Sequence, residues 1–350
     1  MYFNVYSDTG SKIDGYLIPD GFSTKPRISV HSGEIDLGLF ECDVFLAGPY
    51  NLKHHETGVV GFSLDETKIA NLSRLDAIEI RDADSGFTFY RRLQPELHVL
   101  KRVFRLETQF APHQELDRSL RPFFQFFSAG AERFGSETVR QMLEVSNQPS
   151  TYVSGRVMLK GVQQFITDDT IRITSLRDPF YELAIRIWSL ATSKRRNLAF
   201  ISDRDRILFG PAMSYFDKLN LADFDDVRRR IRSAPRDVLT LFESPFTQQL
   251  VASSPSDKVS RDAISNALDA LSQFNIFDAK ETDGRWAEDI SMILGIDSDK
   301  VAFSAVRSPF LEFAEALREI NLLEHVLEND LILFHFIQRA EKRATNAEFS

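Results

Sequence analysis

The spacing of apolar residues changes near residue 93, and this change constrains the fold more than any other feature of the chain. Before it, short segments alternate between apolar and polar residues, and Gly, Pro, Asp and Ser separate them. Alternation with a period of two is typical of strands that bury one face. The clearest such segments are 12–19, 26–33, 34–45, 58–65, 76–83 and 86–93. We therefore expect an all-β antiparallel sandwich over residues 1–93, with a hairpin turn at Asp84, Ser85 and Gly86.

After residue 93, apolar residues recur every three or four positions, as they do along one face of a helix. Segments with this spacing are 113–131, 136–147, 179–195, 223–232, 258–274, 286–295 and 309–345. Only two segments between them, 103–109 and 171–176, read as strands. Residues 94–350 are therefore expected to form a second, helix-rich α/β domain.

The tripeptide Arg177-Asp178-Pro179 separates the second of these strands from the helix that follows it. Asp178 suits the N-cap because its carboxylate can accept an amide hydrogen bond, and Pro179 suits the first turn because it needs no donor there. Arg177 then stands at the carboxyl end of a strand and beside a helix N-terminus. This is where α/β proteins place ligands and where anions are favoured. Arg177 is thus a candidate anion ligand, with a salt bridge to Asp178 or Glu182 as the alternative.

Charge and composition disfavour several classes of protein. The formal net charge of −9 argues against a nucleic-acid partner and against an anionic membrane surface. The single Cys42 cannot form an internal disulfide, and the acidic neighbours Glu41 and Asp43 disfavour its thiolate. There is no leader with a basic and an apolar region, and no run of eighteen apolar residues. We expect a cytoplasmic protein with no membrane span.

A metal site is not expected. His54, His55 and Glu56 have the right side chains for metal ligands. Neighbouring side chains on a strand point to opposite faces, however, and no further ligands follow at metal-binding spacing. The polar edge of a loop is the simpler interpretation.

The order of segments after residue 93 resembles that of the carbohydrate sulfotransferases, which use 3′-phosphoadenosine-5′-phosphosulfate (PAPS) as sulfate donor. Strand, Arg-Asp-Pro and helix over 171–195 follow Tyr-Val-Ser-Gly-Arg at 152–156. The stretch 103–124 resembles the family's first strand, phosphosulfate loop and first helix, and 242–296 is similar to its closing part. The resemblance implies a P-loop-type three-layer domain in which Arg177 holds the donor's 3′-phosphate. PAPS would be the cofactor if the protein is active.

In residues 1–93, the stretches 15–19 and 54–62 look like the small immunoglobulin-like modules of bacterial polysaccharide enzymes. This resemblance implies that the sandwich is immunoglobulin-like. It also implies that the protein acts on or near bacterial surface polysaccharide. A glycan or a sugar nucleotide is then the expected ligand, and a protein of polysaccharide synthesis is the expected partner.

The phosphosulfate loop departs from the family pattern. Such a loop needs inward amides, Gly for close approach, a Lys for charge and a hydroxyl at the helix start. Residues 110–115 are Phe-Ala-Pro-His-Gln-Glu instead, and Ile185 replaces the family's Ser eight positions after the Arg. We therefore expect a sulfotransferase-like binding or regulatory pseudoenzyme with a degenerate donor site.

Two alternatives remain open. In the first, the protein is an active carbohydrate sulfotransferase or another glycan-modifying transferase, in which Arg177, Arg156 and Lys160 bind the donor's phosphate or sulfate groups. His113 and Glu107 are its candidate catalytic residues, because a His beside a carboxylate titrates near neutral pH. These two could instead simply complement the start of a helix. In the second alternative, the protein is a scaffold without enzymatic activity that pairs with a polysaccharide-synthesis enzyme.

Overall fold

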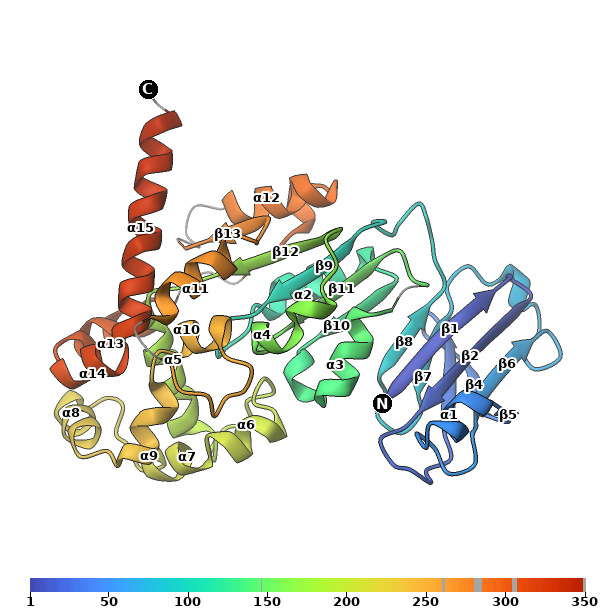
Figure 1. The fold of residues 1–350 in the computed structure, drawn as a ribbon, viewed down its shortest axis with the longest axis horizontal. Helices are drawn as coiled ribbons and strands as arrows, with labels where there is room; N and C mark the ends of the chain where they lie inside the picture. The colour runs from blue at the N-terminus through green and yellow to red at the C-terminus, as the bar shows by residue number, and fades with distance from the viewer. Residues whose placement is uncertain (146, 260–261, 280–284, 304–306, 349–350) are drawn as a thin grey trace.

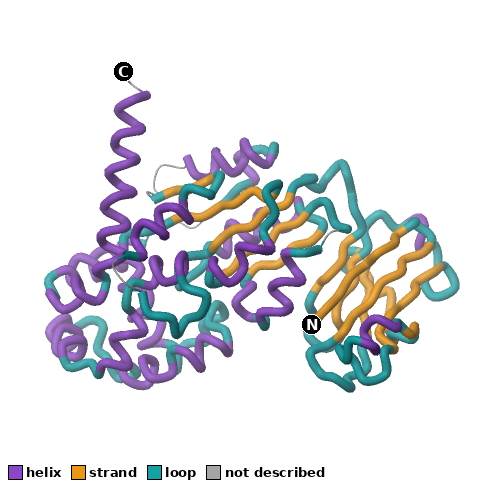
Figure 2. The backbone as a smooth tube through the Cα atoms, in the orientation of Figure 1, coloured by secondary structure: helices purple, strands orange, loops and turns teal. Residues whose placement is uncertain are grey.

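The structure is a computed structural model that describes residues 1–145, 147–259, 262–279, 285–303 and 307–348 (Figure 1). Two antiparallel sheets come first along the chain, and a parallel sheet with helices follows (Figures 1 and 2). Helices then make up most of the remaining chain (Figure 2). The protein is an α/β protein with an N-terminal all-β part, as predicted.

The N-terminal part consists of two four-stranded sheets in which all neighbouring strands are antiparallel. The first has the order β1 (Tyr2–Asp8), β2 (Lys12–Ile18), β6 (Val59–Asp65), β5 (Val44–Phe45). The second has the order β4 (Ile35–Glu41), β3 (Arg27–Ser32), β7 (Glu79–Asp82), β8 (Thr88–Arg91). In immunoglobulin lettering these orders are A-B-E-D and C′-C-F-G, so the sandwich has the immunoglobulin arrangement. Strand β1 lies outside the predicted segments. A short helix, α1 (Ala47–Asn51), joins β5 to β6.

The predicted hairpin lies between β7 and β8. The carboxylate of Asp82 accepts hydrogen bonds from the backbone N–H groups of Asp84 and Ser85, at 3.3 and 3.1 Å. Gly86 has a φ of +72°, which a residue with a side chain rarely adopts. The turn residues therefore act as the sequence predicts.

The second part is built on a five-stranded parallel sheet. Its order is β10 (Phe126–Ala129), β11 (Thr151–Gly155), β9 (Arg102–Leu106), β12 (Thr170–Ser175), β13 (Ile276–Asp278). The prediction of only two strands here was wrong, because β10, β11 and β13 were not recognised. The predicted helix 113–131 contains α2 (Gln114–Leu120) and then β10. A short strand covered on both faces shows no alternation, so its apolar run looks like part of a helix.

Helices cover both faces of this sheet, which gives the predicted three layers. Successive strand residues point to opposite faces. Val103, Tyr152 and Ile173 pack with α2 and with α12 (Arg285–Leu294) on one face. Phe104, Leu106 and Val153 pack on the other face with α3 (Ser136–Leu143), α4 (Leu159–Val162), α10 (Pro245–Val251) and α11 (Ala263–Leu271).

A helical region lies beyond the carboxyl ends of the strands. Its helices are α5 (Pro179–Thr192), α6 (Asp203–Leu208), α7 (Gly210–Phe216), α8 (Phe224–Arg232), α9 (Arg236–Leu239), α13 (Ser308–Arg318), α14 (Asn321–Val326) and α15 (Glu328–Glu348). The predicted single helix 309–345 is three helices. The apolar stripe continues across the breaks at Ile320 and Leu327, so periodicity alone does not reveal them. Within the described ranges, no helix has the length and apolar character needed to cross a membrane.

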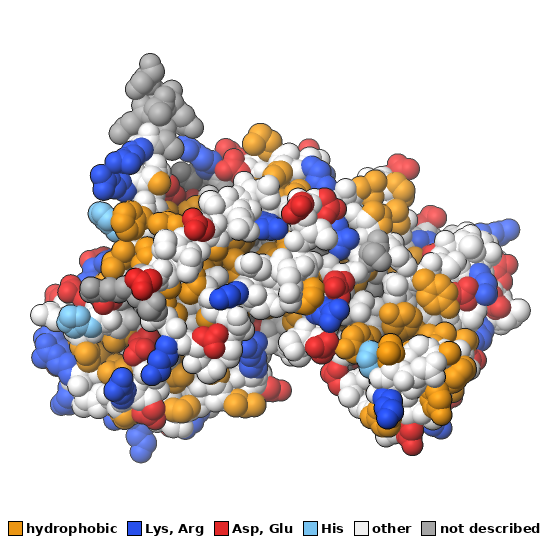
Figure 3. Space-filling view, in the orientation of Figure 1, with side chains coloured by type: hydrophobic (Ala, Val, Ile, Leu, Met, Phe, Trp, Pro, Cys, Tyr) orange, Lys and Arg blue, Asp and Glu red, His pale blue; other side chains and the backbone are white. Residues whose placement is uncertain are grey.

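The sandwich and the parallel sheet share one continuous apolar core. The rings of Phe3 on β1 and Phe126 on β10 stack with their centroids 5.9 Å apart. Figure 3 shows that basic and acidic side chains are interspersed on the face in view. This face therefore presents no single-signed surface of the kind that attracts nucleic acid.

Candidate functional site

The strand order places a crevice at the carboxyl end of β9. From β9 the chain runs outward to β10, returns to β11 beside β9, and then crosses to β12 on the other side of β9. In open α/β sheets, ligands bind where the strand order reverses in this way. Two corners meet there: residues 107–113, which we call the β9 loop, and Arg177 after β12. Arg156 follows the neighbouring strand β11.

The β9 loop is folded around a carboxylate of its own. Glu107 is 2% exposed, and its carboxylate accepts hydrogen bonds from the backbone N–H groups of Gln109 and His113, at 3.0 and 2.8 Å. The N–H of Phe110 donates to the carboxylate of Glu182 on α5, at 2.8 Å. Pro112 has no N–H to offer. The amides that would face a bound phosphate in such a loop therefore bind carboxylates of the chain itself.

A buried arginine holds Glu107 in place. Arg105 is 1% exposed and donates to Glu107 at 2.8 Å and to both carboxylate oxygens of Asp117 on α2, at 2.8 and 2.9 Å. The hydroxyls of Tyr152 and Ser154 donate to the same Asp117, at 2.8 and 2.9 Å. Burial raises the pKa of the Glu107 carboxyl, but the charges of Arg105 and His113 outweigh burial and bring it to about 2. The loop thus contains an internal anion that is ionised at neutral pH.

A second feature is the cavity between the β9 loop and Arg177, which we call the Arg177 pocket. It has a volume of about 250 Å³, and its lining includes residues 111–115 of the loop and of α2. Three arginines line it: Arg118, Arg177 and Arg307. The two corners that the sequence singled out therefore lie together in space.

The walls of the Arg177 pocket are aromatic. Tyr181 and Trp188 of α5 line it, and the Arg177 guanidinium carbon lies 5.4 Å from the centre of the Tyr181 ring. Ser189 of the same helix also lines it, and its buried hydroxyl has no hydrogen-bond partner in the part of the chain that the structure describes. Guanidinium groups beside aromatic rings suit a ligand with both an anionic group and a flat ring.

The start of α5 is built as predicted. The Asp178 carboxylate accepts the N–H groups of Phe180 and Tyr181, at 2.9 and 3.1 Å, and Pro179 opens the helix. Of the two acids proposed as alternative partners of Arg177, Asp178 contacts Arg318 and Glu182 contacts Arg186, and the charge of Arg177 also acts on Glu182. Arg177 itself is 9% exposed and faces the pocket.

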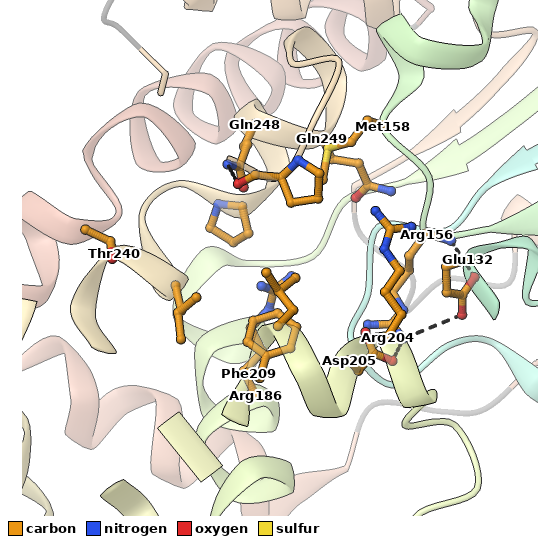
Figure 4. A pocket seen from close by; sticks show the side chains of 14 residues that line it. Glu132, Arg156, Met158, Arg186, Arg204, Asp205, Phe209, Thr240, Gln248 and Gln249 are labelled. Atoms are coloured by element: carbon orange, nitrogen blue, oxygen red, sulfur yellow. Dashed lines mark hydrogen bonds and ion pairs between the residues drawn. The ribbon is translucent and has the colours of Figure 1, made fainter. Parts of the chain in front are cut away.

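The other two candidate phosphate ligands lie elsewhere. Arg156 lines a different pocket (Figure 4), where it donates to Asp205 at 2.6 Å and contacts Glu132 at 3.5 Å. Lys160 is exposed on α4 and lines neither this pocket nor the Arg177 pocket. The structure therefore brings neither Arg156 nor Lys160 to Arg177.

The candidate catalytic residues Glu107 and His113 are in contact, but the contact is made by the backbone of His113 and not by its imidazole. Glu107 accepts its hydrogen bond from the backbone N–H of His113, and the imidazole lies 3.4 Å from the hydroxyl of Ser175. The His113 ring is 2% exposed and packs 5.0 Å from the ring of Trp286. Its position in the wall of the Arg177 pocket would still allow contact with a ligand.

The sequence analysis missed Arg118, Arg307 and Trp188. Arg118 and Trp188 lie on helices that were predicted, but whether their side chains line the pocket depends on the tertiary fold. Arg307 precedes α13, and no local pattern connects it to Arg177.

Other reactive groups are structural. Burial, followed by the nearby Asp43 and Asp82, raises the pKa of the Cys42 thiol to about 12, so this thiol is a poor nucleophile at neutral pH. The described residues contain no cluster of three His, Cys, Asp or Glu side chains arranged to hold a metal ion.

Comparison with known proteins gives one distant likeness. No protein-family model matches the chain, and no curated protein matches it. Among solved structures, it is similar to the crystal structure of a sulfotransferase from Alicyclobacillus acidocaldarius. The two chains are 15% identical, the match covers 67% of this chain and 98% of that chain, and the TM-score is 0.32. A likeness of this size assigns no function.

Proposed function

We propose that this chain is a sulfotransferase-like protein associated with bacterial surface polysaccharide, and that it binds a ligand without transferring sulfate. The β9 loop carries this proposal. In a working donor site, the amides of this loop would face the donor's 5′-phosphosulfate. Here they bind Glu107 and Glu182, and Glu107 is buried and ionised.

Two further observations support the sulfotransferase-like part. The β9 loop and the Arg-Asp-Pro corner follow neighbouring parallel strands, β9 and β12, and line one pocket. Arg177 lies in that pocket, where the resemblance places the ligand of a donor's 3′-phosphate. The association with polysaccharide is supported by the N-terminal sandwich, and we propose that residues 1–93 and 94–350 are separate domains of one protein.

The 3′- and 5′-phosphates of an adenosine ligand are expected to contribute differently to binding. Arg177 would bind a 3′-phosphate, whereas the β9 loop would give a 5′-phosphate little to bind. We expect adenosine 3′-monophosphate and adenosine 3′,5′-bisphosphate to bind with affinities within about twofold of each other, because a phosphate with no charge-assisted hydrogen bonds contributes little. Isothermal titration calorimetry with each nucleotide measures this. Removing the 5′-phosphate from a working donor site would weaken binding by about tenfold or more.

Two variants test the role of Arg177. We expect Arg177→Gln to weaken binding of adenosine 3′-monophosphate by about tenfold, because a charged hydrogen bond to phosphate is lost. The matched control is Lys194→Gln, an exposed cation just after the same helix, which should leave the affinity unchanged. Tight binding of PAPS together with sulfate transfer to a glycan would show that the protein is an active transferase. Co-purification with a polysaccharide-synthesis enzyme, combined with no nucleotide binding at all, would favour the scaffold.

A further inference from the structure

The pocket in Figure 4, which we call the Arg186 pocket, lies apart from the Arg177 pocket and has a volume of about 100 Å³. Its lining comes from α5, α6, α10 and the segment that follows β11. Charged side chains dominate one side of it. They are Arg156, Arg186 and Arg204, with the acids Glu132 and Asp205.

Both acids in the lining are already engaged. The Asp205 carboxylate accepts Arg156 at 2.6 Å and both the N–H and the hydroxyl of Ser202, each at 2.8 Å. Glu132 accepts the backbone N–H of Arg156 at 2.9 Å and lies 3.5 Å from its guanidinium. The two acids are therefore bound to Arg156 and to the start of α6. Neither forms an ion pair with Arg186 or Arg204 within the described residues.

Arg186 is buried with donors to spare. Its side chain is 9% exposed, and its Nε donates to Glu182, which does not line the pocket, at 3.0 Å. Its two terminal nitrogens make no hydrogen bond within the described residues, and they are not among the fully enclosed polar atoms without a partner, so they reach the pocket. The rings of Phe110 and Phe209 lie 5.4 and 6.0 Å from its guanidinium carbon, and the buried Asp330 carboxylate adds a nearby negative charge. An acceptor bound in the pocket would have these donors available.

Arg204 adds a second guanidinium at the same pocket. It is exposed on the first turn of α6, and it makes no ion pair within the described ranges. The pocket thus offers two guanidinium groups, one buried and one exposed, beside the apolar side chains of Met158, Leu208 and Phe209. Paired guanidinium groups match the geometry of carboxylate, sulfate and phosphate oxygens.

We propose that the Arg186 pocket binds an anionic substituent of a ligand, a carboxylate, sulfate or phosphate, between Arg186 and Arg204. The cavity has room for one such group, so the rest of the ligand would extend outward past Arg204. An acidic sugar, with its carboxylate or sulfate ester, has this chemistry. This site is independent of the proposed function, because it uses neither Arg177 nor the β9 loop amides.

Isothermal titration calorimetry on the full chain tests the site. The anionic probes are glucuronate, sulfate and phosphate as sodium salts, at a constant ionic strength set with chloride. Glucose is the neutral probe. We expect at least one anion to bind and glucose not to bind. The anion that binds best identifies the source of the charge: glucuronate points to an acidic sugar, sulfate to a sulfate ester and phosphate to a phosphorylated ligand. Absence of binding by all three anions up to about 50 mM would overturn the proposal.

The residue test uses two exposed arginines of the same helix. Arg204→Gln should weaken binding of the anion by about fivefold or more, because one charged contact is lost. Arg206→Gln is the matched control, since Arg206 is exposed, lies at 3.9 Å from Asp203 and does not line the pocket. Equal affinities of the two variants would overturn the proposal. Arg204→Gln should leave adenosine 3′-monophosphate binding unchanged, so failure here and failure of the proposed function can be told apart.

Discussion

The corners after β9 and β12 lie side by side, yet their polar groups are satisfied in opposite ways. After β12, Asp178 caps the helix that begins at the very next residue, and its partners are two and three positions away. After β9, the amide of Phe110 depends on Glu182 of α5, and the carbonyl of Glu107 accepts the side-chain amide of Gln249 on α10, at 2.7 Å. The amides at the start of α5 are therefore bound within the same corner, whereas the β9 corner also depends on side chains of α5 and α10.

The difference between the two corners affects both stability and function. Removing a helix cap lowers the free energy of unfolding by about 0.5–2 kcal/mol. The β9 corner contains the buried ions Arg105, Glu107 and Asp117, and removing one member of such a group leaves the others uncompensated. The corner after β12 places Arg177 in the wall of a pocket, whereas the corner after β9 encloses an anion of its own.

The largest expected effect comes from removing that internal anion. We expect Glu107→Ala to lower the free energy of unfolding by about 3–5 kcal/mol, because Arg105 loses one of its two buried carboxylate partners and two loop amides lose their acceptor. Urea denaturation followed by circular dichroism measures the change. If an anion is what the loop requires, sulfate or phosphate should restore part of the lost stability of this variant.

The control for this rescue is Asp225→Ala, an exposed acid in the first turn of α8 that lines neither pocket. Sulfate stabilises most proteins through exclusion from their surface, and the control variant measures that general effect. We expect Asp225→Ala to cost about 0.5 kcal/mol and to gain no more from sulfate than the wild type does. Equal gains in the two variants would mean that the β9 loop does not accept an external anion.

The next effect is the pH dependence of the same carboxylate. The pKa of Glu107 is about 2 in the folded protein, below its ordinary value of 4.5, because Arg105 and His113 outweigh the effect of burial. A depressed pKa contributes stability above the unfolded value and loses it as the pH falls toward the folded value. We therefore expect the stability difference between wild type and Glu107→Gln to be constant above pH 5 and to shrink by about 3 kcal/mol as the pH falls from about 4.5 to about 2. Urea denaturation at a series of pH values tests this, and a difference that stays constant across the acid range would contradict the burial of an ionised Glu107.

The contrast between the corners also explains what the sequence could predict. The strand predicted at 171–176 is Thr170–Ser175, and the helix predicted at 179–195 is Pro179–Thr192. Both depend on neighbours in sequence. Most of the half-exposed strands of the sandwich alternate and were recognised, although β1 was missed. By contrast, β10, β11 and β13 are short, lie within the layered core and give no such pattern.

The chemistry of the site could likewise be predicted only where it depends on residues close in sequence. The absence of Gly and Lys from residues 110–115 is visible in the sequence, because it concerns residue types at fixed positions. That the loop amides bind Glu107 is not visible, since it requires knowing that Arg105 and the amides of Gln109 and His113 converge on one carboxylate. The partners of Arg177 in its pocket come from α2, α5 and the start of α13, and only the fold brings them together.

The smallest expected effect is at the local corner, and it tests the comparison directly. Asp178→Ala should lower the free energy of unfolding by about 1–2 kcal/mol, because two amides at the start of α5 lose their acceptor. The ion pair with Arg318 adds little, since both side chains are about a third exposed. The control Asp168→Ala, an exposed acid before β12, should be neutral, and urea denaturation compares the three chains. Because the hydrogen bonds of Asp178 to the start of α5 are local, their loss should leave the β9 loop intact, so Glu107→Ala and Asp178→Ala should be additive in the double variant. A double variant that departs strongly from additivity would show that the corner after β12 also depends on the network around Glu107, and the two corners would then be one unit.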